Sequence, residues 1–142
     1  MAIERTVSAQ PEIDSGKIIT FPLGIPGFEK YTRFTIFHKE ENGINVYWFE
    51  SVEQPSITLT MVDPTVYGLN YELWLTDEEQ ELLAADDPIS IAILLILKKG
   101  EEDSVAGLNA NIAGPVIINM KNRIGLQKVL LRPNVEVNIA ED

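Results

Sequence analysis

The sequence predicts an all-β domain, mainly an antiparallel barrel or sandwich, that also contains one short α-helix. Short runs of β-branched and aromatic residues recur along the chain, and turn residues separate them about every 8 to 12 residues. One of these runs, Ile89–Leu97, is apolar on both of its alternating faces, which is typical of a central strand. At nine residues it is well short of the roughly 20 that a membrane-spanning helix needs.

The first predicted elements are two short strands and a loop. Residues 2–8 alternate weakly between polar and apolar residues, and Lys17–Phe21 is rich in β-branched and aromatic residues, so both segments predict strands. The segment Phe21–Phe28 mixes two prolines and two glycines with large apolar residues. Because proline and glycine disfavour regular structure while the apolar residues supply anchors, this segment predicts an ordered, partly buried loop.

Four further strands are predicted in the middle of the chain. Strands from about Tyr31 to His38 and from Val46 to Glu50 flank an Asn-Gly dipeptide at residues 42–43, which is typical of a two-residue hairpin turn. The segment Ile57–Val62 alternates between apolar and polar residues, and Tyr71–Leu75 leads directly into the helix.

The helix is predicted to begin after Thr76. Thr76 and Glu79, three residues later, form a capping-box pattern, and negative charge in the first turn is favoured by the helix dipole. Apolar residues in the second half of the helix predict the face that packs on the sheet: Leu82, Leu83, Ala84 and Ala85. The helix ends at residues 86–88 (Asp-Asp-Pro), because proline cannot continue a helix.

The last part of the chain predicts an irregular strand and then a hairpin. Ser104–Asn111 is the irregular strand, which Gly107 weakens. Val116–Asn119 and Gln127–Leu131 predict the two strands of the hairpin, with Asn122–Gly125 as its turn.

Length and composition set limits on organisation and function. The 142 residues fit one domain, predicted for residues 1–131, followed by a tail at 132–142 that either pairs at a sheet edge or is mobile. The net charge of −11 disfavours direct binding to nucleic acid or anionic lipid and favours basic protein partners. The absence of cysteine excludes disulfides, zinc–thiolate sites and cysteine nucleophiles. The N-terminus lacks the pattern of a secretion signal, so we expect a cytoplasmic location.

A catalytic or metal site is not predicted. His38 is the only histidine, which excludes a histidine-based triad and a multi-histidine metal site. We therefore expect His38 to be a surface residue at the end of a strand, and we expect neither a metal nor another cofactor.

An acidic cluster is the first candidate for partner binding. It consists of Asp77, Glu78, Glu79, Glu81, Asp86 and Asp87, with no basic residue among them. The ligand spacing of an EF-hand calcium loop is absent. The cluster is a solvated helix face, a docking surface for a basic partner, or a carboxylate pair for hydrolysis, and the last of these requires acids that converge in one cleft. We adopt the docking surface as our hypothesis.

The proline- and glycine-containing loop is the second candidate. Its glycines, Gly24 and Gly27, do not form a phosphate cradle, because Pro26 removes an amide donor and no Lys-Ser/Thr pair follows. The loop is either purely structural or part of a partner surface, for which the candidate side chains are Leu23, Ile25 and Phe28. A basic cluster, which we interpret as a solvated hairpin edge, consists of Lys121, Arg123, Lys128 and Arg132.

Several motifs occur in the order found in one protein family. They are Ile18–Phe28, Ser51-Val52-Glu53, Tyr71-Glu72, Asn111–Asn119, Arg123-Ile124-Gly125 and Gln127. In these motifs, over residues 18–131, the chain resembles the flagellar assembly factor FliW family. The resemblance implies a structural role for Gly24, Pro26, Gly27, Asn111, Pro115, Asn119, Gly125 and Gln127. The chain departs from the family pattern at Asn109, Ile112 and Gly114, where Thr, Leu and Ala are expected.

The resemblance implies a non-enzymatic regulator of flagellum construction. FliW proteins bind flagellin, and they also bind the translational repressor CsrA, an RNA-binding dimer that blocks flagellin synthesis. When secretion consumes flagellin, the freed FliW captures CsrA and translation resumes. We therefore expect CsrA and flagellin as partners, without direct contact to nucleic acid or membrane. The alternative is a small-molecule-binding β-barrel, which requires a barrel interior wide enough for a ligand.

Overall fold

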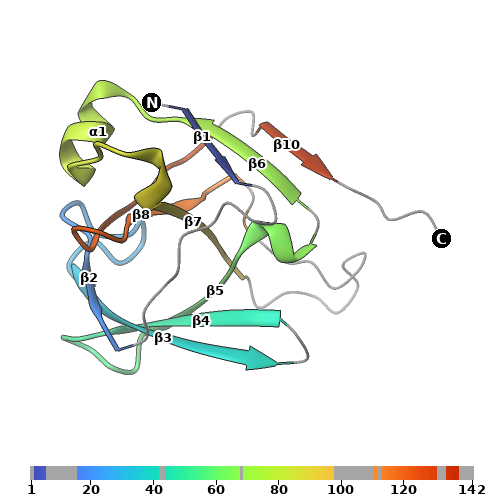
Figure 1. Cartoon of the computed structure of the whole chain (residues 1–142). Helices are drawn as coiled ribbons and strands as arrows, with labels where there is room; N and C mark the ends of the chain where they lie inside the picture. The colour runs from blue at the N-terminus through green and yellow to red at the C-terminus, as the bar shows by residue number, and fades with distance from the viewer. Residues whose placement is uncertain are drawn as a thin grey trace.

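The computed structural model describes residues 2–5, 16–41, 44–67, 69–97, 111, 113–130 and 134–137. Within these residues the chain forms a closed seven-stranded β-barrel, a separate three-stranded sheet and one short α-helix (Figure 1). The predicted all-β class with one short helix is confirmed, and the barrel is the architecture adopted.

The barrel closes on itself through one parallel pair of strands. Around it the strands follow the order β2 (Ile18–Thr20), β3 (Arg33–Glu41), β4 (Ile44–Ser51), β5 (Thr58–Val62), β7 (Ile91–Ile96), β8 (Val116–Asn119) and β9 (Ile124–Gln127). Neighbours are antiparallel except β2 and β9, which pair in parallel at Thr20 and Ile124. Closure gives every barrel strand two neighbours, which protects its backbone from pairing with other chains.

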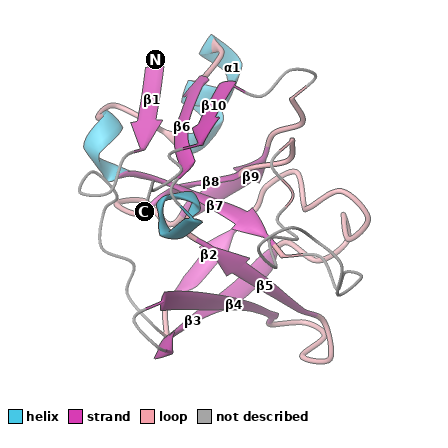
Figure 2. Cartoon of the chain, turned by 90° about the vertical axis from the view of Figure 1, so that its right-hand side faces the viewer, coloured by secondary structure: helices cyan, strands magenta, loops and turns pink. Residues whose placement is uncertain are grey.

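The longest hairpin joins β3 to β4. Glu41 lies opposite Ile44, so two residues connect the strands, as the Asn-Gly dipeptide predicts. The turn residues 42–43 themselves lie outside the described residues. Both views place this hairpin at the end of the molecule opposite the helix (Figures 1 and 2).

The second sheet covers one side of the barrel. It contains β1 (Ala2–Arg5), β6 (Leu69–Trp74) and β10 (Asn134–Val137), with β6 in the middle and antiparallel to both neighbours. The sheet lies above β7 and β8 in Figure 2. Part of the predicted tail, residues 134–137, is therefore an edge strand. The predicted strand segments at residues 6–8 and 104–110 lie outside the described residues.

In the described part of the chain, three short helical elements lie in the connections between strands. They are η1 (Pro64–Tyr67), α1 (Asp77–Leu83) and η2 (Pro88–Ser90), of which η1 and η2 are 3-10 helices. The α-helix follows β6 directly and contacts β9 of the barrel. It therefore lies where the second sheet meets the barrel.

Two hydrophobic cores share strand β7. Its residues Ala92 and Leu94 pack inside the barrel, whereas Ile91, Ile93 and Leu95 pack on the other side, between the barrel wall and the second sheet. All five side chains are buried. The prediction of a central strand with two buried faces is confirmed.

The prediction that this strand begins at Ile89 is wrong. Pro88–Ser90 forms η2 instead, because the Asp87 carboxylate accepts a hydrogen bond from the Ile89 amide (3.0 Å) and proline suits the first turn of a helix. Ile89 is consequently 75% exposed, and the strand starts at Ile91.

The last hairpin is also displaced from its predicted position. Its turn lies at residues 120–123, and the return strand β9 starts at Ile124 instead of Gln127. Arg123 adopts a left-handed backbone (φ 57°), and its amide donates a hydrogen bond to the Asn119 carbonyl (2.7 Å), which closes the turn. Gly125, predicted as a turn residue, therefore belongs to the strand.

The absent side chain at Gly125 makes room for a buried aromatic ring. A Cβ at this position would lie 2.6 Å from Phe21 Cε2. Phe21 is fully buried and packs edge-on against Phe34, with ring centroids 5.6 Å apart, and against Phe49, at 6.2 Å. The glycine of the last hairpin thus completes the aromatic centre of the barrel.

Candidate protein-binding site

Helix α1 begins at the predicted capping box. Thr76 Oγ1 accepts a hydrogen bond from the Glu79 amide (3.2 Å), and Glu79 Oε1 accepts one from the Thr76 amide (2.8 Å), which confirms the prediction. Leu83 is fully buried in the second core, and Leu82 packs partly against it. Because these residues face inward, the acidic side of the helix faces solvent.

Three of the six clustered carboxylates carry uncompensated charge. Asp77, Glu78 and Glu81 are exposed, and none of them forms an ion pair with another described residue. Glu78 and Glu81 are three positions apart and are therefore neighbours on one helix face. This face of α1 presents negative charge to solvent.

Glu79, in contrast, is part of the framework. Its Oε1 lies 2.5 Å from Lys128 Nζ, which also donates a hydrogen bond to the Trp74 carbonyl (2.8 Å). Burial raises the pKa of Glu79, but hydrogen bonds from Lys128 and Thr76 outweigh burial and leave the pKa lowered. Glu79 therefore stays ionised and ties α1 to the end of β9.

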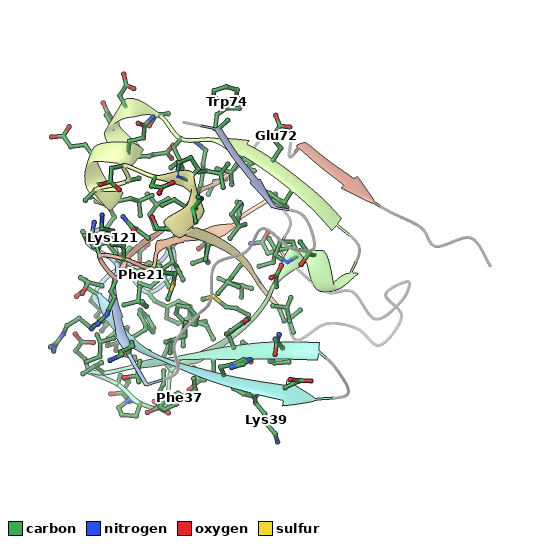
Figure 3. The ribbon with its side chains drawn as sticks, in the orientation of Figure 1. Phe21, Phe37, Lys39, Glu72, Trp74 and Lys121 are labelled. Atoms are coloured by element: carbon green, nitrogen blue, oxygen red, sulfur yellow. The ribbon has the colours of Figure 1, made fainter. Side chains whose placement is uncertain are left out.

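The remaining two carboxylates also have partners. Asp86 forms an exposed ion pair with Lys121 (3.6 Å), which lies close to α1 in Figure 3, and Asp87 caps η2. The prediction that the basic cluster is a solvated hairpin edge is therefore wrong for Lys128, whose side chain is mostly buried beside Glu79. The hairpin packs against α1, so its lysines neutralise part of the acidic cluster. Arg132 lies outside the described residues.

The loop that was the second candidate lies beside this helix, and its conformation depends on glycine. Gly24 has a positive φ of 69°, and a Cβ there would lie 2.5 Å from Glu29 Cα, so no other residue fits. Ile25 is buried in the barrel core, and Phe28 is partly buried against it. Leu23 is 70% exposed, which makes it the one of the three candidate loop side chains that faces solvent.

A pocket of about 440 Å³ opens between the loop and the helix. Leu23, Gly24 and Pro26 line it from the loop, Leu82 from α1, and Leu126 from β9. Its polar lining consists of Glu29, Glu78, Glu79 and Gln127. The two regions that the sequence suggested separately, the loop and the acidic helix, are thus walls of one site.

Glu29 adds a loop carboxylate to the polar lining of this pocket. Its Oε1 accepts a hydrogen bond from the Gly27 amide (3.0 Å). Hydrogen bonds from the backbone amides of Gly27 and of Glu29 itself lower the pKa of this carboxyl, so it is ionised at neutral pH. The sequence did not suggest Glu29 as a site residue, because one acid in a loop is not distinguishable from other surface charges.

Asn119 holds the far end of α1. Its side chain is fully buried, and its Nδ2 donates hydrogen bonds to the carbonyls of Leu83 (2.9 Å) and Ala84 (3.2 Å). Its Oδ1 accepts a hydrogen bond from the Lys121 amide (3.1 Å). Carbonyls at the end of a helix lack intrahelical partners, so Asn119 completes the helix from a neighbouring strand. The family resemblance implied a structural role for Asn119, but it did not indicate that this residue completes the end of α1.

The other motif residues at the end of the chain form a local network. Gln127 Nε2 donates to the Gly114 carbonyl (2.9 Å), and the Gly114 amide donates to the Asn111 carbonyl (3.3 Å). The buried Pro115 accepts from the Lys128 amide (3.0 Å). A Cβ at Gly114, where the family pattern has alanine, would lie 2.6 Å from Asn111 Nδ2. This network therefore holds the Gln127 side chain in its position in the pocket wall.

Some exposed side chains were not anticipated. Trp74 is 65% exposed and points away from the second sheet, as does Glu72 (Figure 3). Phe37 is 40% exposed and, like Lys39, points outward from β3 in the same view. His38 is exposed, as predicted, but it lies within β3, which continues to Glu41, and not at the end of the strand. Its ring stacks on Tyr47 with centroids 5.0 Å apart.

The described ranges contain no group of three or more histidine and carboxylate side chains placed to hold a metal ion. None of the helices in the same ranges has the length and apolar character to cross a membrane.

Known proteins that are similar to this chain belong to one family. The family model for the FliW protein matches residues 2–140. The flagellar assembly factor FliW 1 of Desulfotalea psychrophila is 49% identical over 133 residues, which cover 94% of each chain. The flagellar assembly factor FliW of Azoarcus sp. is 37% identical over 144 residues and 99% of each chain.

A solved structure is similar over most of the fold. It is a crystal structure of the flagellar assembly factor FliW, which superposes with a TM-score of 0.69 at 27% identity and covers 89% of this chain and 86% of that one. The family motifs, the barrel with its single short helix and these matches lead to one assignment: the chain belongs to the FliW family.

Proposed function

We propose that this protein is a non-enzymatic flagellar assembly factor that works by binding other proteins in the cytoplasm. Its partners are flagellin and the RNA-binding repressor CsrA, whose capture relieves repression of flagellin translation. The names of its relatives support the role in flagellar assembly. The two partners are those that the family resemblance implies.

The observation that carries the proposal is the uncompensated negative face of α1. Asp77, Glu78 and Glu81 are exposed and unpaired among the described residues, in a chain with a net charge of −11. A repressor that binds RNA carries positive charge, because its ligand is a chain of phosphates. Complementary charge accelerates association and selects such a partner over neutral or acidic proteins.

A small-molecule-binding barrel is less well supported. Large side chains fill the barrel interior, including Phe21, Phe34, Phe49 and Met61, all fully buried. The pocket described above lies outside the barrel wall, between a loop and a helix. A ligand-binding barrel would instead hold its cavity between the strands.

Calorimetric titration against the host's CsrA and, separately, its flagellin tests the proposal at two salt concentrations. We expect both partners to bind with micromolar or tighter affinity, and we expect CsrA binding to weaken as salt rises, because salt screens exposed charges. Binding to flagellin alone would reduce the role to that of a flagellin chaperone. Binding to neither protein would contradict the proposal.

A further inference from the structure

The pocket between the loop and α1 has an apolar interior. Leu23 and Pro26 form one side, Leu82 forms the other, and the mostly buried Leu126 contributes from the barrel. Its volume of about 440 Å³ lies near the lower end of the range for sites that enclose small organic groups, roughly 300 to 1,000 Å³. A site of this size receives one or two side chains and not a whole helix.

The pocket also carries an unbalanced negative charge. Glu29 contributes a carboxylate from the loop and Glu78 another from the helix, and neither has an ion-pair partner among the described residues. Glu79 also lines the pocket, but Lys128 compensates it. An apolar group that enters therefore passes two carboxylates that have no ion-pair partner among the described residues, and these attract a neighbouring cation and repel an anion.

We propose that this pocket receives one aliphatic side chain of the basic, RNA-binding partner, flanked in that partner's sequence by a lysine or arginine. The inference rests on the proposed function and deepens it, because it states the chemistry of the partner segment that is bound. The aliphatic group fills the space between Leu23 and Leu82 and removes the exposed surface of Leu23 from water. The flanking cation pairs with Glu78 or Glu29. Buried anchors of this kind contribute much of the affinity in protein interfaces.

Two matched pairs of variants test the proposal by calorimetry with CsrA and flagellin. Leu23→Ala removes a pocket wall, whereas Ile89→Ala removes a similarly exposed apolar side chain that does not line the pocket. Glu78→Gln removes a pocket charge, whereas Glu81→Gln removes the same charge from the same helix outside the pocket. For CsrA, we expect about tenfold weaker binding for Leu23→Ala and no change for Ile89→Ala. We expect Glu78→Gln to weaken binding about threefold more than Glu81→Gln.

A direct probe separates the pocket from the choice of partner. N-acetyl-leucyl-lysine amide is titrated into the ¹⁵N-labelled protein, with N-acetyl-leucyl-glutamate amide as the matched probe of opposite charge. We expect the lysine probe to shift the amide resonances of Leu23, Gly24 and Gln127 at lower concentration than the glutamate probe. The same shifts should be lost in Leu23→Ala.

The two proposals fail in different ways. If the wild type binds a partner and each pocket variant behaves like its control, the pocket inference is overturned and the proposed function stands. If the wild type binds neither partner, the proposed function is overturned, and the dipeptide titration decides the pocket. Equal or absent shifts with the two dipeptides would overturn the pocket inference.

Discussion

At the residue scale, a glycine that resembles a turn residue in the sequence is a packing residue in the barrel. Gly125 lies in β9, and the space of its absent side chain is occupied by the ring of Phe21. Phe21 is fixed in turn by Phe34 and Phe49. A methyl group at this position therefore has no flexible neighbour to displace.

We expect Gly125→Ala to lower the free energy of unfolding by about 1 to 3 kcal/mol, because overpacking a rigid core forces side chains and backbone to move. Gly114→Ala is the control, since its Cβ would meet the ends of two flexible amide side chains, Asn111 and Gln127. Urea denaturation measures both variants. Equal losses for the two would show that the aromatic centre of the barrel is not rigid.

Asn119 is the second residue whose environment determines its role. It is fully buried, and both polar atoms of its amide are used, by the end of α1 and by the following turn. Removal of the Asn119 side-chain amide leaves three backbone groups without this hydrogen-bond partner: the carbonyls of Leu83 and Ala84 and the amide of Lys121. An unsatisfied buried polar group costs about 1 to 3 kcal/mol.

We expect Asn119→Ala to lower the free energy of unfolding by about 2 to 3 kcal/mol and to speed hydrogen exchange in α1. Asn122→Ala is the matched control, because Asn122 also donates to the Ala84 carbonyl (3.3 Å) but is exposed. Its loss should stay below about 1 kcal/mol. If the two variants unfold at the same denaturant concentration, Asn119 does not hold the helix.

At the scale of elements, α1 is joined to β9 by the pair Glu79–Lys128. The side chains are 22% and 16% exposed, respectively, so solvent screens this pair less than it screens Asp86–Lys121 at 68% and 63%. The pair also fixes the helix that carries Glu78. Its protonation state therefore affects both stability and the shape of the pocket.

The pH dependence of this pair follows from the direction of the pKa shift. The pKa of Glu79 is lower in the folded protein than its ordinary value of 4.5. The unfolded state therefore takes up a proton first as pH falls, so the contribution of Glu79 is complete well above pH 4.5 and is lost as pH falls through the folded pKa. Protonation of Glu79 should consequently contribute to acid unfolding.

We expect Glu79→Gln to lower the free energy of unfolding by about 1 kcal/mol or more at pH 7 and to flatten its decline below about pH 4.5. Asp86→Asn, which breaks the exposed pair, should change the free energy of unfolding by less than about 1 kcal/mol. Urea denaturation at several pH values checks both variants. An unchanged acid limb in Glu79→Gln would show that other carboxylates control acid unfolding.

At the scale of the whole molecule, helix α1 with its exposed carboxylates lies at one end, and the hairpin β3–β4 lies at the other (Figures 1 and 2). The net charge of −11 acts at long range on any basic partner, whereas under the proposed function Glu78 and Glu81 determine where that partner docks. Reversing charges at either end separates the long-range effect of the net charge from the local effect of Glu78 and Glu81.

We expect Glu78→Lys combined with Glu81→Lys to slow association with CsrA by about tenfold at low salt, with little loss of stability. Glu40→Lys combined with Glu50→Lys makes the same change of net charge on β3–β4 and should slow association less. Surface plasmon resonance at about 50 and 500 mM salt measures the rates, because exposed charges are screened at the higher concentration. Identical rates for the two double variants would move the docking surface away from α1.

The sequence alone determined the elements whose signals are local. Alternation and turn residues predicted the strands, the capping box of Thr76 and Glu79 predicted the helix, and the two apolar faces of the central strand predicted its double burial. Predicted element boundaries were wrong where another local interaction was stronger. At Ile89, Asp87 and Pro88 favour a 3-10 turn over the predicted strand. The residues that make these interactions lie within a few positions of each other, so the sequence contains most of the information needed to predict these elements.

Only the tertiary structure decided which acidic residues are free and that the loop and the helix form one pocket. The sequence presents six similar carboxylates, and folding pairs Glu79 with Lys128 and places Glu78 in the lining of the same pocket as Leu23. Barrel closure brings β9 back to β2, and with it Leu126 to the loop that follows β2. Contacts between residues so far apart in the chain depend on strand order and register, which no local pattern contains.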